Sequence, residues 1–318
     1  MGPEVEAFEK EWAEYCGAKY CVGVSSGTDA LYLALKAVAK NQEVLTTPAT
    51  FFATVQAIIQ SENQPTFVDI GDDYNIDVGE GARSKAYIRL PVHLYGRPVE
   101  IPDPNPYLVI EDSAQAHGLP LRGKMACFSF YPTKNLGAMG QAGAVVTNDV
   151  DLANAVREMR TYCERGRFVH YGTTGNFRMD ELQAAILRAK LPHLDGWNKS
   201  RRDIAGIYRD YLERLEGVVL PRDHPEHSYH IYAIRVKERD DLAKHLERYG
   251  IQTSIRYPVP MHLQPTLKYL GYHKGDFPVA EEWAKTNLSL PMYPELTEKQ
   301  VEYVAIKIRL WVNSKENW

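Results

Sequence analysis

Short apolar runs rich in β-branched residues alternate with segments of helical periodicity over the first two thirds of the chain. Apolar residues recur at helical spacing between residues 30 and 38, within 151–163 and within 179–190. Strands that alternate with helices are typical of a mainly parallel sheet covered on both faces. We therefore predict an α/β fold with a mainly parallel seven-stranded sheet, its strands at residues 20–24, 43–46, 66–69, 86–92, 107–110, 126–130 and 143–147.

The pattern changes near residue 195. A chain of 318 residues has room for two domains of roughly 150 residues each. We predict a large domain over residues 1–194 and a smaller C-terminal α+β domain over residues 195–318. The elements expected in the smaller domain are a helix at 198–216, a strand at 230–236, a helix at 240–249, a proline-rich loop at 257–260 and a helix at 298–312.

Charge and apolar content exclude several classes of partner. The chain has 37 basic and 41 acidic residues, a net charge of −4 and no basic block, so we expect no nucleic acid. No apolar run reaches the ~18 residues that span a bilayer, and the N-terminus lacks signal-peptide features, so we expect no membrane. Four cysteines without metal-ligand spacing predict reduced thiols, a cytoplasmic protein and no metal site.

Chemically reactive side chains follow three of the predicted strands. Gly27 and Thr28 follow the first and Asp112 the fifth, while Ser129 lies near the end of the sixth and Lys134 follows it. Because ligands of open α/β sheets bind at the carboxyl ends of strands, we expect these residues to lie together. They are the minimum set for pyridoxal phosphate (PLP): the lysine forms an imine with the aldehyde, a hydroxyl contacts the phosphate, and the carboxylate keeps the ring nitrogen protonated.

Each of these residues also has a plainer interpretation. Residues 25–29 could form an ordinary helix cap, and Asp112 could cap a helix or form a salt bridge. Lys134 could be a solvated surface charge. Its aromatic and glycine-rich neighbours instead favour a partly dry pocket, in which a lysine has a lowered pKa and acts as an amine nucleophile.

Two further side chains could contact a flat cofactor. Phe51 or Phe52 could stack on its ring, with core packing as the alternative. Gln115 could donate a hydrogen bond to a ring oxygen, with a solvated loop amide as the alternative. The segment around Gly27 has neither the spacing of a Walker loop nor that of a dinucleotide fingerprint.

Six motifs occur in an order and spacing that are specific to one family: GPEVEAFE at 2–9, SGTDAL at 26–31, EDSAQAHG at 111–118, FSFYPTKNLG at 128–137, GAVVTND at 143–149 and GNFRMDELQAA at 175–185. With these motifs the chain resembles the DegT/StrS-type sugar aminotransferases, PLP enzymes of the aspartate-aminotransferase fold. The similarity extends from about Gly2 to Pro294. It implies that the large domain binds PLP and that the chain is a transaminase.

The resemblance also implies roles for single residues. Lys134 matches the lysine that binds PLP covalently and Asp112 the partner of the ring nitrogen, so we expect these two to be catalytic. The neighbouring subunit is expected to supply one phosphate contact, which implies a homodimer with shared active sites. The other implied cofactor contacts are Gln115 near the ring hydroxyl, Phe51 on the ring face, Gly27, Thr28 and Ser129 at the phosphate, and Asn176 at the phosphate of the neighbouring subunit.

The substrates implied by the resemblance are an amino-acid donor, expected to be L-glutamate, and a nucleotide-linked keto-sugar. Residues 257–265 resemble a loop that lies near the sugar in members acting on dTDP-linked 3-keto-6-deoxyhexoses. Just before it, Arg256 stands where the family has histidine. The residues expected to contact the substrate are Arg178, Arg256, Tyr257 and His262.

Several segments are shorter than the family pattern. Residues 79–85 and 98–106 are too short for crossover helices, since a crossover usually takes a dozen or more residues. Residues 41–42 and 119–125 also look trimmed, and the chain starts at a motif that follows a longer segment in the family. We therefore expect a reduced version of the fold with fewer covering helices.

Three alternatives to an active aminotransferase stay open. The shortened segments fit a catalytically inactive paralogue with a binding or regulatory role. A PLP-dependent sugar dehydratase of the same superfamily has histidine in place of the lysine, so Lys134 disfavours it. A Rossmann-type oxidoreductase is disfavoured because the glycine fingerprint is missing.

Overall fold

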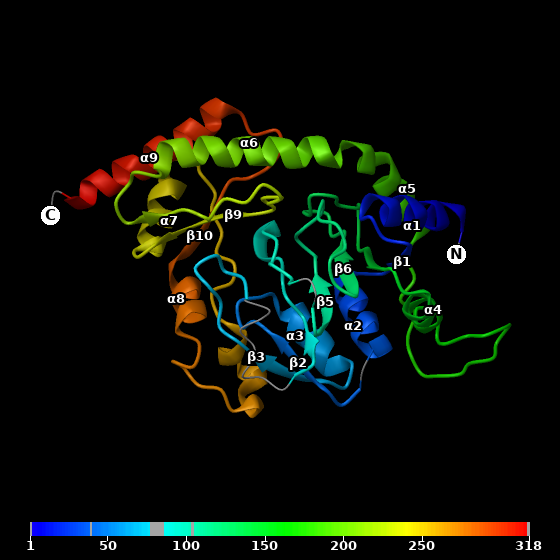
Figure 1. The fold of residues 1–318 in the computed structure, drawn as a ribbon. Coiled ribbons are helices and arrows are strands. Elements are labelled where there is room, and N and C mark those ends of the chain that lie inside the picture. The colour runs from blue at the N-terminus through cyan, green and yellow to red at the C-terminus, as the bar shows by residue number, and fades with distance from the viewer. Residues whose placement is uncertain (1, 39, 77–85, 103–104, 317–318) are drawn as a thin grey trace.

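The computed structural model describes residues 2–38, 40–76, 86–102 and 105–316, which form two β-sheets with helices around them (Figure 1). In the large sheet the order of strands is β1-β7-β6-β5-β4-β2-β3. The pairs from β6 to β3 are parallel, whereas β7 is antiparallel to β1 and β6. The mainly parallel seven-stranded sheet is confirmed. Its strands are β1 (Tyr20–Val24), β2 (Glu43–Thr46), β3 (Gln64–Phe67), β4 (Ile88–Arg89), β5 (Leu108–Asp112), β6 (Met125–Ser129) and β7 (Gly143–Thr147).

Alternate side chains of the large sheet enter two apolar layers, as the two-residue period of a strand requires. On one face, Phe128 and Val146 pack against Trp12. On the other face, Val145 packs in the layer that contains Leu33. Both faces of the central strands are therefore buried, and the helices that cover this half are α1 (Pro3–Tyr15), α2 (Gly27–Val38), α3 (Phe52–Gln60), α4 (Val150–Met159) and α5 (Glu181–Lys190).

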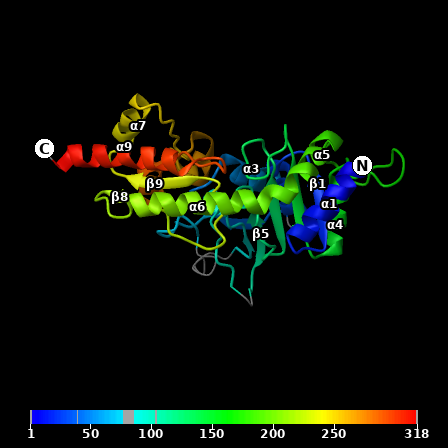
Figure 2. The same cartoon turned by 90° about the horizontal axis from the view of Figure 1, so that it is seen from above.

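The second half of the chain contains a three-stranded antiparallel sheet of order β10-β9-β8. Seen from above, α6 extends from the large sheet to this small sheet, with α9 beside it (Figure 2). No helix of the described residues is long and apolar enough to cross a membrane. The elements of this half are α6 (Leu194–Leu212), β8 (Val218–Val219), β9 (Tyr232–Val236), α7 (Arg239–Arg248), α8 (Pro278–Thr286), β10 (Asn287–Leu290) and α9 (Glu298–Glu316).

The predicted elements agree with the observed ones to within a few residues, apart from β4; two further strands and three α-helices were not predicted. β4 has two residues where 86–92 were predicted, and Pro91, which has no N–H to donate, lies just beyond its end. The hydrophobic pattern did not predict α1, α3, α8, β8 or β10. The whole of the segment 79–85 and residues 103–104 lie outside the described residues. In the described part between β3 and β5, the single helical turn is a 3-10 turn at Leu94–Gly96.

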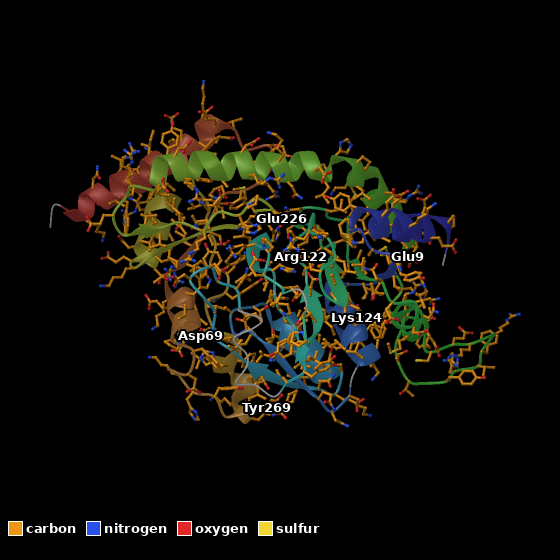
Figure 3. All side chains as sticks on the ribbon, viewed as in Figure 1. Glu9, Asp69, Arg122, Lys124, Glu226 and Tyr269 are labelled. Atoms are coloured by element: carbon orange, nitrogen blue, oxygen red, sulfur yellow. The ribbon has the colours of Figure 1, made fainter. Side chains whose placement is uncertain are left out.

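Polar contacts join the two halves of the chain. Asp69, which follows β3, accepts hydrogen bonds from the backbone N–H groups of Val279 and Ala280 at the start of α8, both at 2.9 Å. Arg122 and Glu226 form an ion pair of 2.5 Å and lie side by side in Figure 3. These contacts, with the apolar packing between the halves, fix the edge of the large sheet against the later segments of the chain.

Candidate active site

A cavity of about 400 Å³ opens where the strands of the large sheet end. Segments that follow β1, β2, β5 and β6 line it, together with the segment before β9 and the loop after α7. The expectation that strand-end residues meet at one edge is thus met. Nine residues singled out from the sequence line this cavity: Gly27, Thr28, Phe51, Asp112, Gln115, Ser129, Lys134, Arg256 and Tyr257.

Asp112 is the last residue of β5 and is 5% exposed. The Thr54 hydroxyl donates to its Oδ2 at 2.8 Å, and the Ala114 N–H donates to its Oδ1 at 3.2 Å. Burial raises the pKa of Asp112 above its usual range, and the two hydrogen bonds oppose that shift. The charges and hydrogen bonds around the carboxyl therefore do not cancel the rise in its pKa that burial causes. A positive group bound beside it would stabilise its ionised form.

Lys134 follows β6 in a turn closed by its own N–H, which donates to the Tyr131 carbonyl at 2.8 Å. Burial lowers the pKa of Lys134 to about 8; Asp112 raises it and Arg256 lowers it further. Among the described residues the amine has no hydrogen-bond or ion-pair partner. A neutral amine is therefore accessible near physiological pH, as a nucleophile requires.

Gly27 and Ser129 touch at the floor of the cavity. A Cβ atom added to Gly27 would lie 2.5 Å from the Cβ of Ser129 and 3.1 Å from its Cα, closer than real side chains approach. Gly27 is the first residue of α2, whose free N–H groups point toward the strand ends. This backbone can approach an anion closely, and the hydroxyls of Thr28 and Ser129 line the same wall.

An amide and two aromatic side chains, those of Gln115, Tyr257 and Phe51, also line the cavity and contact one another. Gln115 accepts a hydrogen bond from the Tyr95 N–H at 2.6 Å through Oε1, which leaves its Nε2 to donate to the Tyr257 hydroxyl at 3.2 Å. The Phe51 ring lies 5.5 Å from the Tyr257 ring and is 55% exposed, so it is not a core residue. The Tyr95 hydroxyl donates to the Arg256 carbonyl, which holds the loop against this wall.

Three candidates lie outside the cavity. Asn176 and Arg178 are paired with each other, the Arg178 Nε–H donating to Asn176 Oδ1 at 2.9 Å. His262 is buried, and its Nε2 lies 3.1 Å from Glu281 Oε1. Its ring does not line this cavity.

The sequence interpretation missed three residues of the site. Thr54 holds Asp112, and it lies one helical turn after Phe51 on α3, a helix that was not predicted. His230 lines the cavity, and Tyr95 orients Gln115. Thr54 could have been found by recognising helix α3. His230 and Tyr95 lie in segments without a local motif, so no sequence signal pointed to them.

A family model, described as the DegT/DnrJ/EryC1/StrS aminotransferase family, matches residues 1–309. The chain belongs to this family. It is 39% identical to the dTDP-3-amino-3,4,6-trideoxy-alpha-D-glucose transaminase of Streptomyces venezuelae, over 98% of this chain and 88% of the relative. The predicted family, fold class and aminotransferase activity are confirmed. The matched stretch of 332 positions exceeds the 318 residues of this chain, so the alignment contains gaps in this chain.

Solved structures agree with this assignment. DesV of S. venezuelae, solved in complex with a ketimine intermediate, has a TM-score of 0.93 at 39% identity, covering 98% of this chain and 90% of that chain. NtdA of Bacillus subtilis, solved with bound cofactor PMP, has a TM-score of 0.90 at 29% identity, covering 98% of this chain and 78% of that chain. The chain thus shares the fold of these solved structures.

Acylation of the Lys134 amine should be half-maximal near pH 8 in the cofactor-free protein, because burial lowers its pKa to about 8. Asp112→Asn should move this midpoint to lower pH, since the carboxylate favours the charged ammonium form. Peptide mass spectrometry after pulsed labelling measures both midpoints, and labelling of the exposed Lys199 should not differ between the two proteins. A midpoint that stays or rises in Asp112→Asn would contradict the electrostatic coupling.

Proposed function

We propose that this aminotransferase moves an amino group from an amino-acid donor, L-glutamate, to a nucleotide-linked keto-sugar, and that PLP binds in the cavity described above. One observation carries the proposal: the nucleophilic amine of Lys134 and the buried carboxyl of Asp112 line one cavity with the Gly27–Ser129 floor. The transaminase from S. venezuelae supports the substrate class, because its name specifies a dTDP-linked amino sugar.

The residues present fit PLP. Lys134 would bond to the aldehyde carbon. Asp112 would pair with the protonated ring nitrogen, whose positive charge would counter the rise in the Asp112 pKa that burial causes. The glycine floor leaves room for a phosphate where a Cβ would not fit. The remaining contacts we propose are Gln115 to the ring oxygen, Phe51 on the ring face, and Thr28 and Ser129 to the phosphate.

When bound, PLP supplies an electron sink that allows the C–H bond beside the donor nitrogen to break. Asp112 would keep the ring nitrogen protonated, and that positive charge would in turn offset the burial that raises the pKa of Asp112. Lys134, released by the donor, would move a proton between the donor's α-carbon and the cofactor's C4′ carbon. A pKa of about 8 leaves a usable neutral fraction of this amine at pH 7.

The loop at the mouth of the cavity is the proposed sugar site. Arg256 and Tyr257 line the cavity from this loop. A guanidinium binds phosphate or carboxylate with two parallel N–H groups, which suits an anionic substrate. His262 would act only indirectly, by holding the loop through its pair with Glu281.

We further propose a homodimer in which each cavity is completed by the other subunit. The segment from Thr161 to Arg178 leaves the body of the molecule as an arm (Figure 1). Phe168 and Tyr171 on this arm are 77% and 66% exposed, and exposed apolar side chains of this kind mark interaction surfaces. The arm would bring Asn176, with Arg178 beside it, to the phosphate site of the partner.

Domain division and location complete the proposal. The boundary between residues 194 and 195 falls at the start of α6, the helix that leads to the small sheet. All four cysteines are free and buried, in keeping with a reduced, cytoplasmic setting.

Lys134→Ala should abolish the covalent bond to PLP, because its amine is the proposed nucleophile. Borohydride reduction followed by peptide mass spectrometry should place the cofactor on residue 134 in the wild type and on no residue in the variant. Lys199→Ala, at an exposed lysine with an ion pair to Asp203, is the matched control and should be labelled like the wild type. A reduced adduct on a different lysine in Lys134→Ala would refute the assignment.

Gly27→Ala should weaken PLP binding by roughly tenfold or more, a cost of about 1.4 kcal/mol, because the new Cβ would collide with Ser129 at 2.5 Å. Titration with PLP, followed by absorbance, measures the Kd. Gly206→Ala on α6 is the matched control, since an added Cβ there meets nothing within 4 Å. Equal Kd values for Gly27→Ala and the wild type would show that the phosphate lies elsewhere.

Mixing Lys134→Ala with Asn176→Ala should restore activity if the subunits share their sites. Half of the randomly formed dimers would be mixed and would have one intact site of two, so roughly a quarter of wild-type activity is expected. Activity is measured after co-expression and compared with each variant alone. If Asn176 acted within its own chain, no site would be intact and the mixture would gain nothing.

A further inference from the structure

Two buried threonine hydroxyls stand in a row behind the Asp112 carboxyl. Thr54 Oγ1 lies 2.8 Å from Asp112 Oδ2, and Thr50 Oγ1 lies 2.7 Å from Thr54 Oγ1. Both threonines are 1% exposed, and both line the cavity. Thr50 is not itself bonded to Asp112, so an effect of Thr50 on the carboxyl must pass through Thr54.

These hydrogen bonds have one direction when Asp112 is ionised. A carboxylate carries no hydrogen, so the Thr54 hydroxyl must be the donor to Asp112. A threonine hydroxyl has a single hydrogen, and Thr54 has used its own, so Thr54 can only accept from Thr50. Thr50 thus donates to Thr54, and Thr54 donates to Asp112. We call this series of two donors the hydroxyl chain.

A neutral Asp112 suits the hydroxyl chain less well. If the protonated carboxyl donated to Thr54, Thr54 would donate to Thr50, and the hydrogen of Thr50 would need an acceptor. Among the described residues Thr50 Oγ1 has Thr54 as its one hydrogen-bond partner, and the side chain is buried. If the carboxyl kept its hydrogen elsewhere, Thr54 would donate to an uncharged oxygen, which accepts more weakly than an ionised one. In both cases the hydroxyl chain favours the ionised carboxylate.

The rest of Asp112 is also held in place. Its N–H donates to the Pro91 carbonyl at 2.9 Å, and its carbonyl accepts from the His93 N–H at 3.1 Å. Its Oδ1 accepts from the Ala114 N–H at 3.2 Å. Because the backbone and Oδ1 are fixed, the Thr54 hydrogen bond to Oδ2 determines the plane of the carboxyl.

The electrostatics of the carboxyl agree with this geometry. Burial raises the pKa of Asp112, and the Thr54 hydrogen bond is the largest influence that lowers it, ahead of the Ala114 N–H and the Lys134 charge. Helix α3 itself carries no titratable side chain. The titratable side chains coupled to Asp112 come from other segments: Lys134 after β6, His93 after β4, Cys127 on β6 and Tyr257 in the loop after α7.

We propose that Thr50 and Thr54 are positioning residues whose hydroxyl chain holds the Asp112 carboxylate ionised and fixed in orientation, ready to receive a cation in the cavity. The identity of that cation as the ring nitrogen of PLP rests on the proposed function, whereas the hydroxyl chain itself does not. Donation from Thr50 polarises the Thr54 O–H bond, so the outer hydroxyl strengthens a hydrogen bond in which it takes no part. Asp112 is thereby prepared for a positive partner before that partner binds.

Paired substitutions remove or keep each hydroxyl. Thr54→Val and Thr50→Val replace a hydroxyl by a methyl group of similar size, whereas Thr54→Ser and Thr50→Ser keep the hydroxyl. Thr54→Ala and Thr50→Ala delete the same groups if a valine does not fit. Thr46→Val is the matched control, because Thr46 is fully buried on β2 and donates at 2.8 Å to the Leu90 carbonyl rather than to Asp112.

The ionisation of Asp112 can be measured in the cofactor-free full chain. Aspartate carboxyls are labelled with carbon-13 and followed by NMR against pH, and the signal missing from Asp112→Asn belongs to Asp112. Thr54→Val should raise its midpoint by about one pH unit, the effect of one lost hydrogen bond to a charged group. Thr50→Val should raise it by about a quarter as much. The serine variants and Thr46→Val should titrate like the wild type.

An unchanged midpoint in Thr54→Val or in Thr50→Val would overturn the proposal, as would an equal shift in Thr46→Val. A second readout uses the PLP-loaded proteins, in which nitrogen-15 in the cofactor ring reports its protonation at a fixed pH. Thr54→Val should move this chemical shift toward the unprotonated value, and Thr50→Val should do so by less. Borohydride should fix the cofactor to Lys134 in the wild type; if it does not, the proposed function has failed, and the carboxyl midpoints still decide the hydroxyl chain.

Discussion

One cavity contains a partly buried amine and a buried carboxyl, and each shifts the pKa of the other. Burial lowers the pKa of Lys134 to about 8 and raises the pKa of Asp112, so both groups are driven toward their neutral forms. Their mutual attraction acts in the opposite sense. The site is therefore incomplete as protein alone: a cationic ring nitrogen beside Asp112 would hold the carboxylate ionised, and an aldehyde would occupy the amine.

The topology of the sheet brings these groups together. Parallel strands β5 and β6 end at the same edge, where Asp112 pairs with Cys127; Ser129 lies two residues further along β6 and Lys134 in the turn beyond. β7 is antiparallel and begins at that edge, so its contribution, Gln141, comes from the residues before the strand. Gly27 closes the floor because no larger residue fits against Ser129.

The parts of the site that the sequence could predict are those carried by local motifs. Lys134, Asp112 and Gly27 follow apolar runs whose period identifies them as strands, so their position at one edge could be predicted. Tyr95 and His230 could not be predicted this way, because their positions depend on hydrogen bonds to Gln115 and Asn135, far away in the sequence. The same holds for the fold. Most strands could be predicted from their hydrophobic pattern, whereas α1, α3 and α8 could not, because tertiary packing determines them.

C-terminal segments cover part of the large sheet. In the described residues between β3 and β5 the single helical turn is a 3-10 turn, and C-terminal residues such as Met261 and Trp283 pack in the same apolar layer as Phe67 and Val109. The indole N–H of Trp283 donates at 3.0 Å to the Tyr95 hydroxyl, which in turn donates to the Arg256 carbonyl. The segment that covers this face thus also positions the loop at the mouth of the cavity.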